Sequence, residues 1–229
     1  MLPTSRLQVY REMLRGGLVP LFHHDDPDVA IAVVRAVAAS GCRVLEFTNR
    51  GAAAHEVFAA LQAAGRRERL DVLVGAGSIV DPATAGLYLN LGAAFVVGPT
   101  LEPEVARVCN RRKVAYLPGC ATATEIGRAE ELGCEIVKLF PGGAAGGPSF
   151  VKAVLGPSPW TRIMPTGGVQ PTHDSLDEWF SAGVACVAMG SRLITRELIE
   201  HKDWAGLTAS VAKALQLITE LRDIPKEVV

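Results

Sequence analysis

Eight short apolar runs, each followed by a helical pattern, constrain the fold of this chain more than any other feature of its sequence. The runs are rich in Val, Leu and Ile and occupy residues 18–22, 44–48, 72–75, 94–97, 114–117, 136–140, 162–165 and 186–189. Buried strands that alternate with helices indicate βαβ units with parallel strand pairing. Eight units within 229 residues predict one α/β domain, 1–229, folded as a (β/α)8 TIM barrel with an extra N-terminal helix.

Two other parallel architectures fit the alternation less well. An open doubly wound sheet is expected to carry a G-x-G-x-x-G turn after its first strand, and this chain has none there. A leucine-rich solenoid requires an L-x-x-L-x-L repeat that is also missing. Helix-start signals support the barrel, because Asp26 and Asp81 each precede a proline, and Thr122 and Glu125 have the spacing of a capping box.

Charge and cysteine usage exclude several classes of function. The formal net charge is -1 with no basic run, which argues against a nucleic-acid partner. No apolar stretch approaches the ~18 residues of a membrane span, and the first residues lack the layout of a signal peptide. The five cysteines are scattered without a C-x-x-C pair, so we expect reduced thiols in a cytoplasmic protein rather than disulfides or a zinc site.

Polar residues on the second predicted strand point to a site inside the barrel. Side chains alternate along a strand, so Glu46, Thr48 and Arg50 share one face while Leu45 and Phe47 share the other. A carboxylate, a hydroxyl and a guanidinium in one column, near the C-terminal end of a barrel strand, are typical of an active site. The alternative is an internal Glu–Arg ion pair that ties layers of the barrel together.

Lys138 lies in the middle of the sixth apolar run. Lysine is seldom fully buried unless it is paired or used chemically, and a neutral lysine amine is a nucleophile suited to Schiff-base formation. Parity places Lys138 with Phe140 on the inward face, where Glu46 would act as its general acid and base. The alternative is an edge strand, or a lysine whose stem lies on apolar surface while its ammonium reaches water.

Glycine-rich turns end most of the predicted strands, and those after the seventh and eighth strands are typical of a phosphate site in a barrel. Their backbone N–H groups suit a phosphate dianion, and the residues concerned are Gly167, Gly168, Gly190 and Ser191. His23 and His24 follow the first strand and are expected at the same rim. Adjacent residues on an extended chain point to opposite sides, so these histidines make a poor metal pair.

The ordered set of motifs resembles the class I aldolases of the KDPG/KHG family, which cleave 2-keto-3-deoxy-6-phosphogluconate (KDPG) and, in some members, 4-hydroxy-2-oxoglutarate (KHG). The motifs span residues 19–191 and read Val44-Leu-Glu-x-Thr-x-Arg50, Gly75-Ala-Gly-Ser78, Leu117-Pro-Gly119, Val137-Lys-x-Phe-Pro141 and Pro165-Thr-Gly-Gly168. The resemblance implies a (β/α)8 enzyme without a metal or other cofactor, commonly a homotrimer. Its substrate would be a small 2-keto-3-deoxy sugar acid, phosphorylated in KDPG, the intermediate of the Entner–Doudoroff route of carbohydrate metabolism.

The same resemblance implies roles for individual residues. Lys138 matches the Schiff-base lysine, Glu46 the acid and base, and Arg50 the group that binds the pyruvate carboxylate. Ser78 stands where the family usually has threonine. The residues that match the pocket and its phosphate end are Phe140, Thr166, Gly167, Gly168 and Ser191.

The chain departs from the family pattern at two places. After Glu46 the family often reads T-L-R-T, whereas this chain reads Thr48-Asn-Arg-Gly51. After the lysine the family commonly reads F-P-A-E, whereas this chain reads Phe140-Pro-Gly-Gly143 and lacks the glutamate. These departures leave the lysine chemistry intact and bear on the aldehyde half of the substrate. The alternatives are an aldolase for a related acid such as the galactonate epimer, a sugar-phosphate isomerase or epimerase, and a sugar-phosphate binding module without catalysis.

Overall fold

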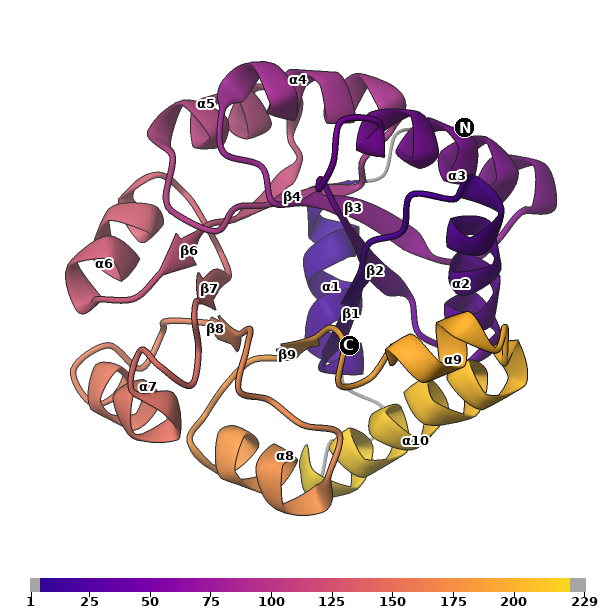
Figure 1. The fold of residues 1–229 in the computed structure, drawn as a ribbon. Helices are drawn as coiled ribbons and strands as arrows, with labels where there is room; N and C mark the ends of the chain where they lie inside the picture. The colour runs from indigo at the N-terminus through magenta and orange to yellow at the C-terminus, as the bar shows by residue number, and fades with distance from the viewer. Residues whose placement is uncertain (1–4, 223–229) are drawn as a thin grey trace.

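The computed structural model describes residues 5–222, in which parallel strands close into a ring surrounded by helices (Figure 1). The hydrogen-bonded orders are β5-β4-β3-β2-β1-β9 and β6-β7-β8. The strands are β1 (Leu18–Phe22), β2 (Val44–Thr48), β3 (Leu73–Gly77), β4 (Phe95–Val97), β5 (Ala115–Leu117), β6 (Gly119–Cys120), β7 (Val137–Leu139), β8 (Ile163–Pro165) and β9 (Val187–Met189). The predicted (β/α)8 barrel is therefore confirmed, whereas the domain limits 1 and 229 lie outside the described residues.

Two features join the two sheets into one barrel. A parallel bridge between Thr166 and Ala188 links the end of β8 to β9. On the other side, β5 and β6 are separated only by Pro118, whose ring nitrogen has no hydrogen to donate to a ladder. The Pro118 carbonyl still accepts a hydrogen bond of 2.9 Å from the Lys138 amide. The fifth predicted strand, 114–117, corresponds to β5, and the barrel continues beyond the proline as β6.

Three of the helices that surround the barrel begin at the start signals predicted from the sequence. The side chains of Asp26 and Asp81 cap their helices by accepting hydrogen bonds from backbone N–H groups. Thr122 and Glu125 form a complete capping box. The helices are α1 (Arg6–Gly16), α2 (Pro27–Ala39), α3 (Ala54–Glu68), α4 (Pro82–Leu91), α5 (Pro103–Arg112), α6 (Ala123–Glu131), α7 (Gly147–Leu155), α8 (His173–Ser181), α9 (Arg196–Glu200) and α10 (Trp204–Arg222). None of the helices in residues 5–222 is long and apolar enough to cross a membrane.

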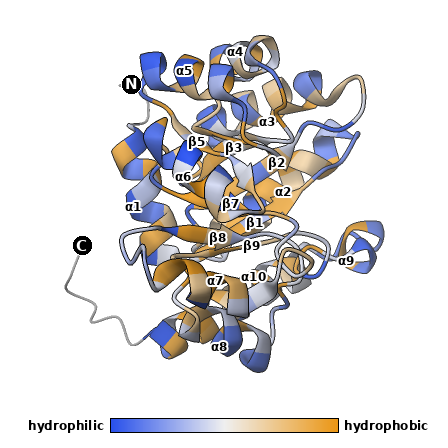
Figure 2. Cartoon of the chain, turned by 90° about the vertical axis from the view of Figure 1, so that its left-hand side faces the viewer, coloured by the Kyte–Doolittle hydropathy of each residue, from blue (hydrophilic) through white to orange (hydrophobic). Residues whose placement is uncertain are grey.

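The extra helix α1 closes the N-terminal end of the barrel. Its residues Val9, Tyr10 and Met13 are buried among inward-facing strand residues such as Val19 and Phe95. In Figure 2, α1 and α9 lie at opposite ends of the barrel. Because α1 fills one end with apolar side chains, the opening for a ligand lies at the other end, where the strands finish and α9 stands.

Alternate strand residues pack on the surrounding helices and form a second, larger core. Leu45, Phe47, Val137 and Leu139 all belong to it. All five cysteines are free and buried, and burial raises the pKa of the Cys42 thiol to about 11. These thiols therefore serve as packing residues in the folded protein.

Candidate active site

Strand β2 presents its polar column to the barrel interior, as its alternation predicts. Glu46 and Thr48 are 1% and 2% exposed, whereas Arg50, two residues beyond, is exposed. The Thr48 hydroxyl donates to the Phe22 carbonyl on β1 at 3.3 Å. Among the described residues, neither Arg50 nor Lys138 forms an ion pair with Glu46, whose Oε2 has no hydrogen-bond partner. The structure therefore does not contain the internal Glu–Arg pair that was the alternative.

Strand β7 holds Lys138 inside the barrel between β6 and β8. The side chain is nearly buried, at 6% exposure, and its Nζ lies 4.7 Å from the centre of the Phe140 ring. A lysine in a central strand at this exposure is neither on a sheet edge nor extended into water. The structure thus excludes both alternatives to an inward-facing amine, and Phe140 connects that amine to the opening of the barrel.

Glu46 is an acid whose surroundings favour the protonated form. Complete burial raises its pKa, while the positive charges of Lys138 and Arg50 act in the opposite direction with smaller effect. Desolvation of this kind is how enzymes bring a carboxyl group into the range where it both accepts and returns a proton. Glu46 and Lys138 thus face the same space with complementary chemistry.

The burial of Glu46 predicts a pH dependence of stability with a defined sign. Its pKa in the folded protein lies above the ordinary 4.5, so between these two values the folded chain binds more protons than the unfolded chain. The free energy of unfolding is therefore expected to fall as the pH rises through that window. Glu46→Gln lacks this pH dependence, so in urea unfolding its free energy of unfolding should rise relative to that of wild type as the pH is raised above 4.5. Parallel curves for the two proteins would contradict the burial argument.

Gly77, on β3 beside β2, provides the space that Glu46 occupies. A Cβ atom at Gly77 would overlap the Glu46 carboxyl group and lie 2.8 Å from its Cγ. A side chain at this position therefore has to move the carboxyl from its place.

Gly77→Ala is expected to lower kcat by about tenfold or more and to reduce the free energy of unfolding by about 1–3 kcal/mol, because it overpacks the interior. Steady-state cleavage and urea unfolding measure the two effects. Gly86→Ala is the matched control, since Gly86 lies in α4 and a Cβ atom added there would meet no atom within 4 Å. Equal behaviour of the two variants would show that Gly77 does not position Glu46.

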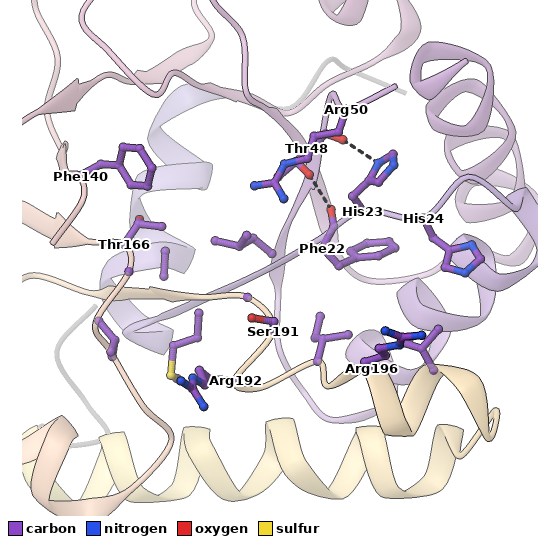
Figure 3. A pocket seen from close by; sticks show the side chains of 18 of the residues that line it. Phe22, His23, His24, Thr48, Arg50, Phe140, Thr166, Ser191, Arg192 and Arg196 are labelled. Atoms are coloured by element: carbon purple, nitrogen blue, oxygen red, sulfur yellow. Dashed lines mark hydrogen bonds between the residues drawn. The ribbon is translucent and has the colours of Figure 1, made fainter. Parts of the chain in front are cut away.

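A cleft of about 690 Å³ opens at the C-terminal end of the barrel (Figure 3). The predicted site residues that line it are Thr48, Arg50, Phe140, Thr166, Gly167, Gly168, Gly190 and Ser191. The buried Glu46 and Lys138, and Ser78, half-buried at the end of β3 with a φ of 60°, are not among the lining residues. The structure thus gathers eight predicted residues around one opening, and a role for Ser78 in binding stays a prediction.

Two buried polar atoms near this cleft have no partner in the described part of the chain. They are Glu46 Oε2 and the hydroxyl oxygen of Thr166. An unsatisfied buried polar atom costs about 1–3 kcal/mol, and such atoms are typical of sites that bind a ligand or a catalytic water. Both therefore mark positions where a bound molecule would complete the hydrogen bonding.

The two histidines line the rim of the cleft, as their position in the sequence predicts. His23 contacts the Thr48 carbonyl at 3.2 Å and Asp25 at 3.1 Å through its two ring nitrogens. His24 Nδ1 accepts a hydrogen bond of 3.0 Å from the backbone amide of Asp26. In the neutral ring the hydrogen is therefore carried by Nε2. Within residues 5–222, no three His, Cys, Asp or Glu side chains are grouped closely enough to hold a metal.

Two arginines of the cleft, Arg192 and Arg196, do not appear among the residues predicted from the sequence. Arg192 directly follows Ser191 in the sequence. A basic residue beside a predicted phosphate-binding turn is a local signal that could have marked Arg192 as a site residue. Arg196 belongs to α9, a five-residue helix, and its Nε lies 2.5 Å from Glu200 Oε1. Only the tertiary structure shows that α9 stands beside the cleft.

Comparisons with known proteins agree with this geometry. The sequence profile of the family described as "KDPG and KHG aldolase" matches residues 9–210. The 2-dehydro-3-deoxy-phosphogluconate aldolase of Treponema pallidum is 32% identical over 93% of this chain and 98% of its own length. The corresponding enzyme of Pseudomonas aeruginosa is 34% identical over 90% of each chain.

A solved structure adds a covalent intermediate to this set of relatives. The KDPG aldolase of Legionella pneumophila, solved with pyruvate captured at low pH as a covalent carbinolamine, is 26% identical to this chain. The two superpose with a TM-score of 0.81, covering 90% of this chain and 97% of the other. With the profile match and the relatives above, the barrel and its buried lysine place this chain in the KDPG and KHG aldolase family.

Proposed function

We propose that this chain is a class I aldolase that cleaves KDPG into pyruvate and glyceraldehyde 3-phosphate. The observation that carries the proposal is that the barrel interior holds both the nearly buried amine of Lys138 and the buried carboxyl of Glu46, whose pKa is raised. A nucleophilic amine and a proton carrier that face one space are the two groups a Schiff-base aldol cleavage requires. The names of the relatives support KHG, cleaved to pyruvate and glyoxylate, as a second substrate.

The first step of the proposed reaction is addition of the Lys138 amine to the C2 carbonyl of the 2-keto acid. Loss of water from the carbinolamine produces a protonated Schiff base, which withdraws electrons from the neighbouring carbons. Arg50, exposed at the end of β2 and on the cleft wall, is suited to hold the C1 carboxylate through paired N–H donors. The carbonyl would then be oriented towards the amine beneath the Phe140 ring.

The second step breaks the C3–C4 bond. Glu46, directly or through a water, accepts the proton of the C4 hydroxyl, and the bonding electrons pass to the Schiff base to form an enamine. The aldehyde leaves, Glu46 returns its proton to C3, and hydrolysis of the Schiff base frees pyruvate and the Lys138 amine. One group serves as base and then as acid, for which a carboxyl with a raised pKa is suited. The unpartnered oxygens of Glu46 and Thr166 support hydrogen bonding to substrate or water here.

Borohydride trapping tests this proposal. Reduction of the protein in the presence of pyruvate should add one reduced pyruvyl group to Lys138, located by peptide mass spectrometry. An isomerase, an epimerase or a binding module on the same barrel would yield no such adduct. Absence of the adduct at saturating pyruvate would refute the Schiff-base mechanism, and turnover of KDPG, its C4 epimer and KHG then ranks the substrates.

We also propose a homotrimer that works in the cytoplasm without a metal. The family resemblance supports the trimer, and exposed apolar side chains such as Trp160, at 67%, are available for subunit contacts. Five free, buried cysteines suit a reducing compartment. Light scattering in solution measures the assembly, and cleavage that survives a chelator would support chemistry carried by Lys138 and Glu46 without a metal.

A further inference from the structure

The cleft carries two guanidinium groups that have no ion-pair partner in the described chain. Four of the side chains that line it bear a formal charge: Arg50, Arg192, Arg196 and Glu200. Arg196 is paired with Glu200 at 2.5 Å. Within residues 5–222, Arg50 and Arg192 form no ion pair and their guanidinium groups make no hydrogen bond. The cleft is therefore cationic, with its two free guanidinium groups on different elements.

These two arginines stand at two separate places along the cleft. Arg50 follows β2 and Arg192 follows β9, with β1 between them in the sheet. Neighbouring strands lie ~4.8 Å apart, so the ends of β2 and β9 are separated by roughly 10 Å. Figure 3 shows the two side chains across the cleft from one another, with Ser191 between them. This arrangement fits a ligand with an anionic group at each end better than a ligand with one.

We propose that Arg192 selects the charged tail of the substrate, binding a terminal phosphate monoester while Arg50 holds the C1 carboxylate. This inference rests on the proposed aldolase function and assigns to Arg192 the discrimination between phosphorylated and unphosphorylated 2-keto acids. It adds a charged side chain to a subsite otherwise built from the turns at Gly167, Gly168 and Ser191.

Physical chemistry explains what the guanidinium adds. Backbone N–H groups and a serine hydroxyl are neutral donors, so they leave the charge of a phosphate dianion uncompensated. A guanidinium offers paired donors that match phosphate oxygens together with a full positive charge. Arg192 is exposed, so the surrounding water and salt weaken this interaction, and a moderate effect on binding is expected rather than loss of catalysis.

Kinetics on two substrates test the proposal. Arg192→Ala should lower kcat/KM for KDPG by about tenfold or more, mainly through KM, because tail binding stabilises substrate and transition state alike. The same variant should cleave unphosphorylated 2-keto-3-deoxygluconate as wild type does. Arg192→Lys should recover part of the loss, since it keeps the charge without the paired donors. Arg111→Ala is the control, because Arg111 is an exposed arginine of α5 that does not line the cleft.

Calorimetric binding of glycerol 3-phosphate keeps the test independent of turnover. Wild type should bind it, Arg192→Ala about tenfold more weakly, and glycerol should not bind to either. Equal binding by wild type and Arg192→Ala, or an equal loss of activity on both substrates, would overturn the role of Arg192. Failure of the aldolase function itself would appear as the absence of a borohydride adduct in wild type, which the binding measurement does not require.

Discussion

Replacement of Lys138 by alanine is expected to lower kcat for KDPG cleavage on the order of 10⁵-fold or more, the size of loss seen when a covalent nucleophile is removed. The reaction then has no Schiff base to accept the electrons of the C3–C4 bond. Borohydride reduction with pyruvate should leave no adduct on the protein. Steady-state kinetics with a lactate dehydrogenase-coupled assay for pyruvate, together with intact-protein mass spectrometry, measure both results.

The barrel should remain folded in Lys138→Ala. Lys138 has no ion-pair partner among the described residues, so its removal leaves no opposite charge stranded in the interior. Circular dichroism and urea unfolding check this. Lys152→Ala is the matched control, because Lys152 is an exposed lysine of α7, and it should retain wild-type turnover. Turnover near the wild-type level in Lys138→Ala would refute the Schiff-base mechanism.

Glu46→Gln is expected to have the second-largest effect, a fall in kcat of about 10²–10⁴-fold. Glutamine preserves the shape of the side chain inside the barrel but cannot accept a proton from the C4 hydroxyl or return one to the enamine. The Lys138 amine is unchanged, so prolonged borohydride reduction with pyruvate should still label it. A variant that forms the adduct and does not turn over would separate proton transfer from covalent bond formation.

The pH dependence of kcat supplies a second measurement for Glu46. Wild type should show a limb that reports a carboxyl group titrating above its ordinary pKa, as expected for the complete burial of Glu46. That limb should be absent from the residual activity of Glu46→Gln. Glu131→Gln, at an exposed position at the end of α6, should change neither kcat nor its pH profile. Retention of the limb in Glu46→Gln would assign the proton transfer to another group.

Local signals in the sequence account for most of the architecture. Strand and helix alternation predicts the barrel, because hydrophobic periodicity and capping residues act over a few neighbouring positions. Parity along β2 and β7 predicts that Glu46 and Lys138 face inward, since successive side chains on a strand point to opposite faces. The break at Pro118 between β5 and β6 follows from the same local chemistry.

Tertiary packing decided which residues from distant strands lie close together at the site. Glu46 is buried in space left at Gly77 of β3, and this burial raises its pKa, while the positive charge of Lys138 on β7 acts in the opposite direction. All three residues are distant from one another in the chain. On α9, Glu200 pairs with Arg196, and Arg192 has no ion-pair partner in the described part of the chain. The sequence by itself determined the elements and the direction of their side chains, because those depend on near neighbours. Only the closed ring brought residues from β2, β7 and β9 around one cleft, because distances between remote segments arise from the packing of the whole chain.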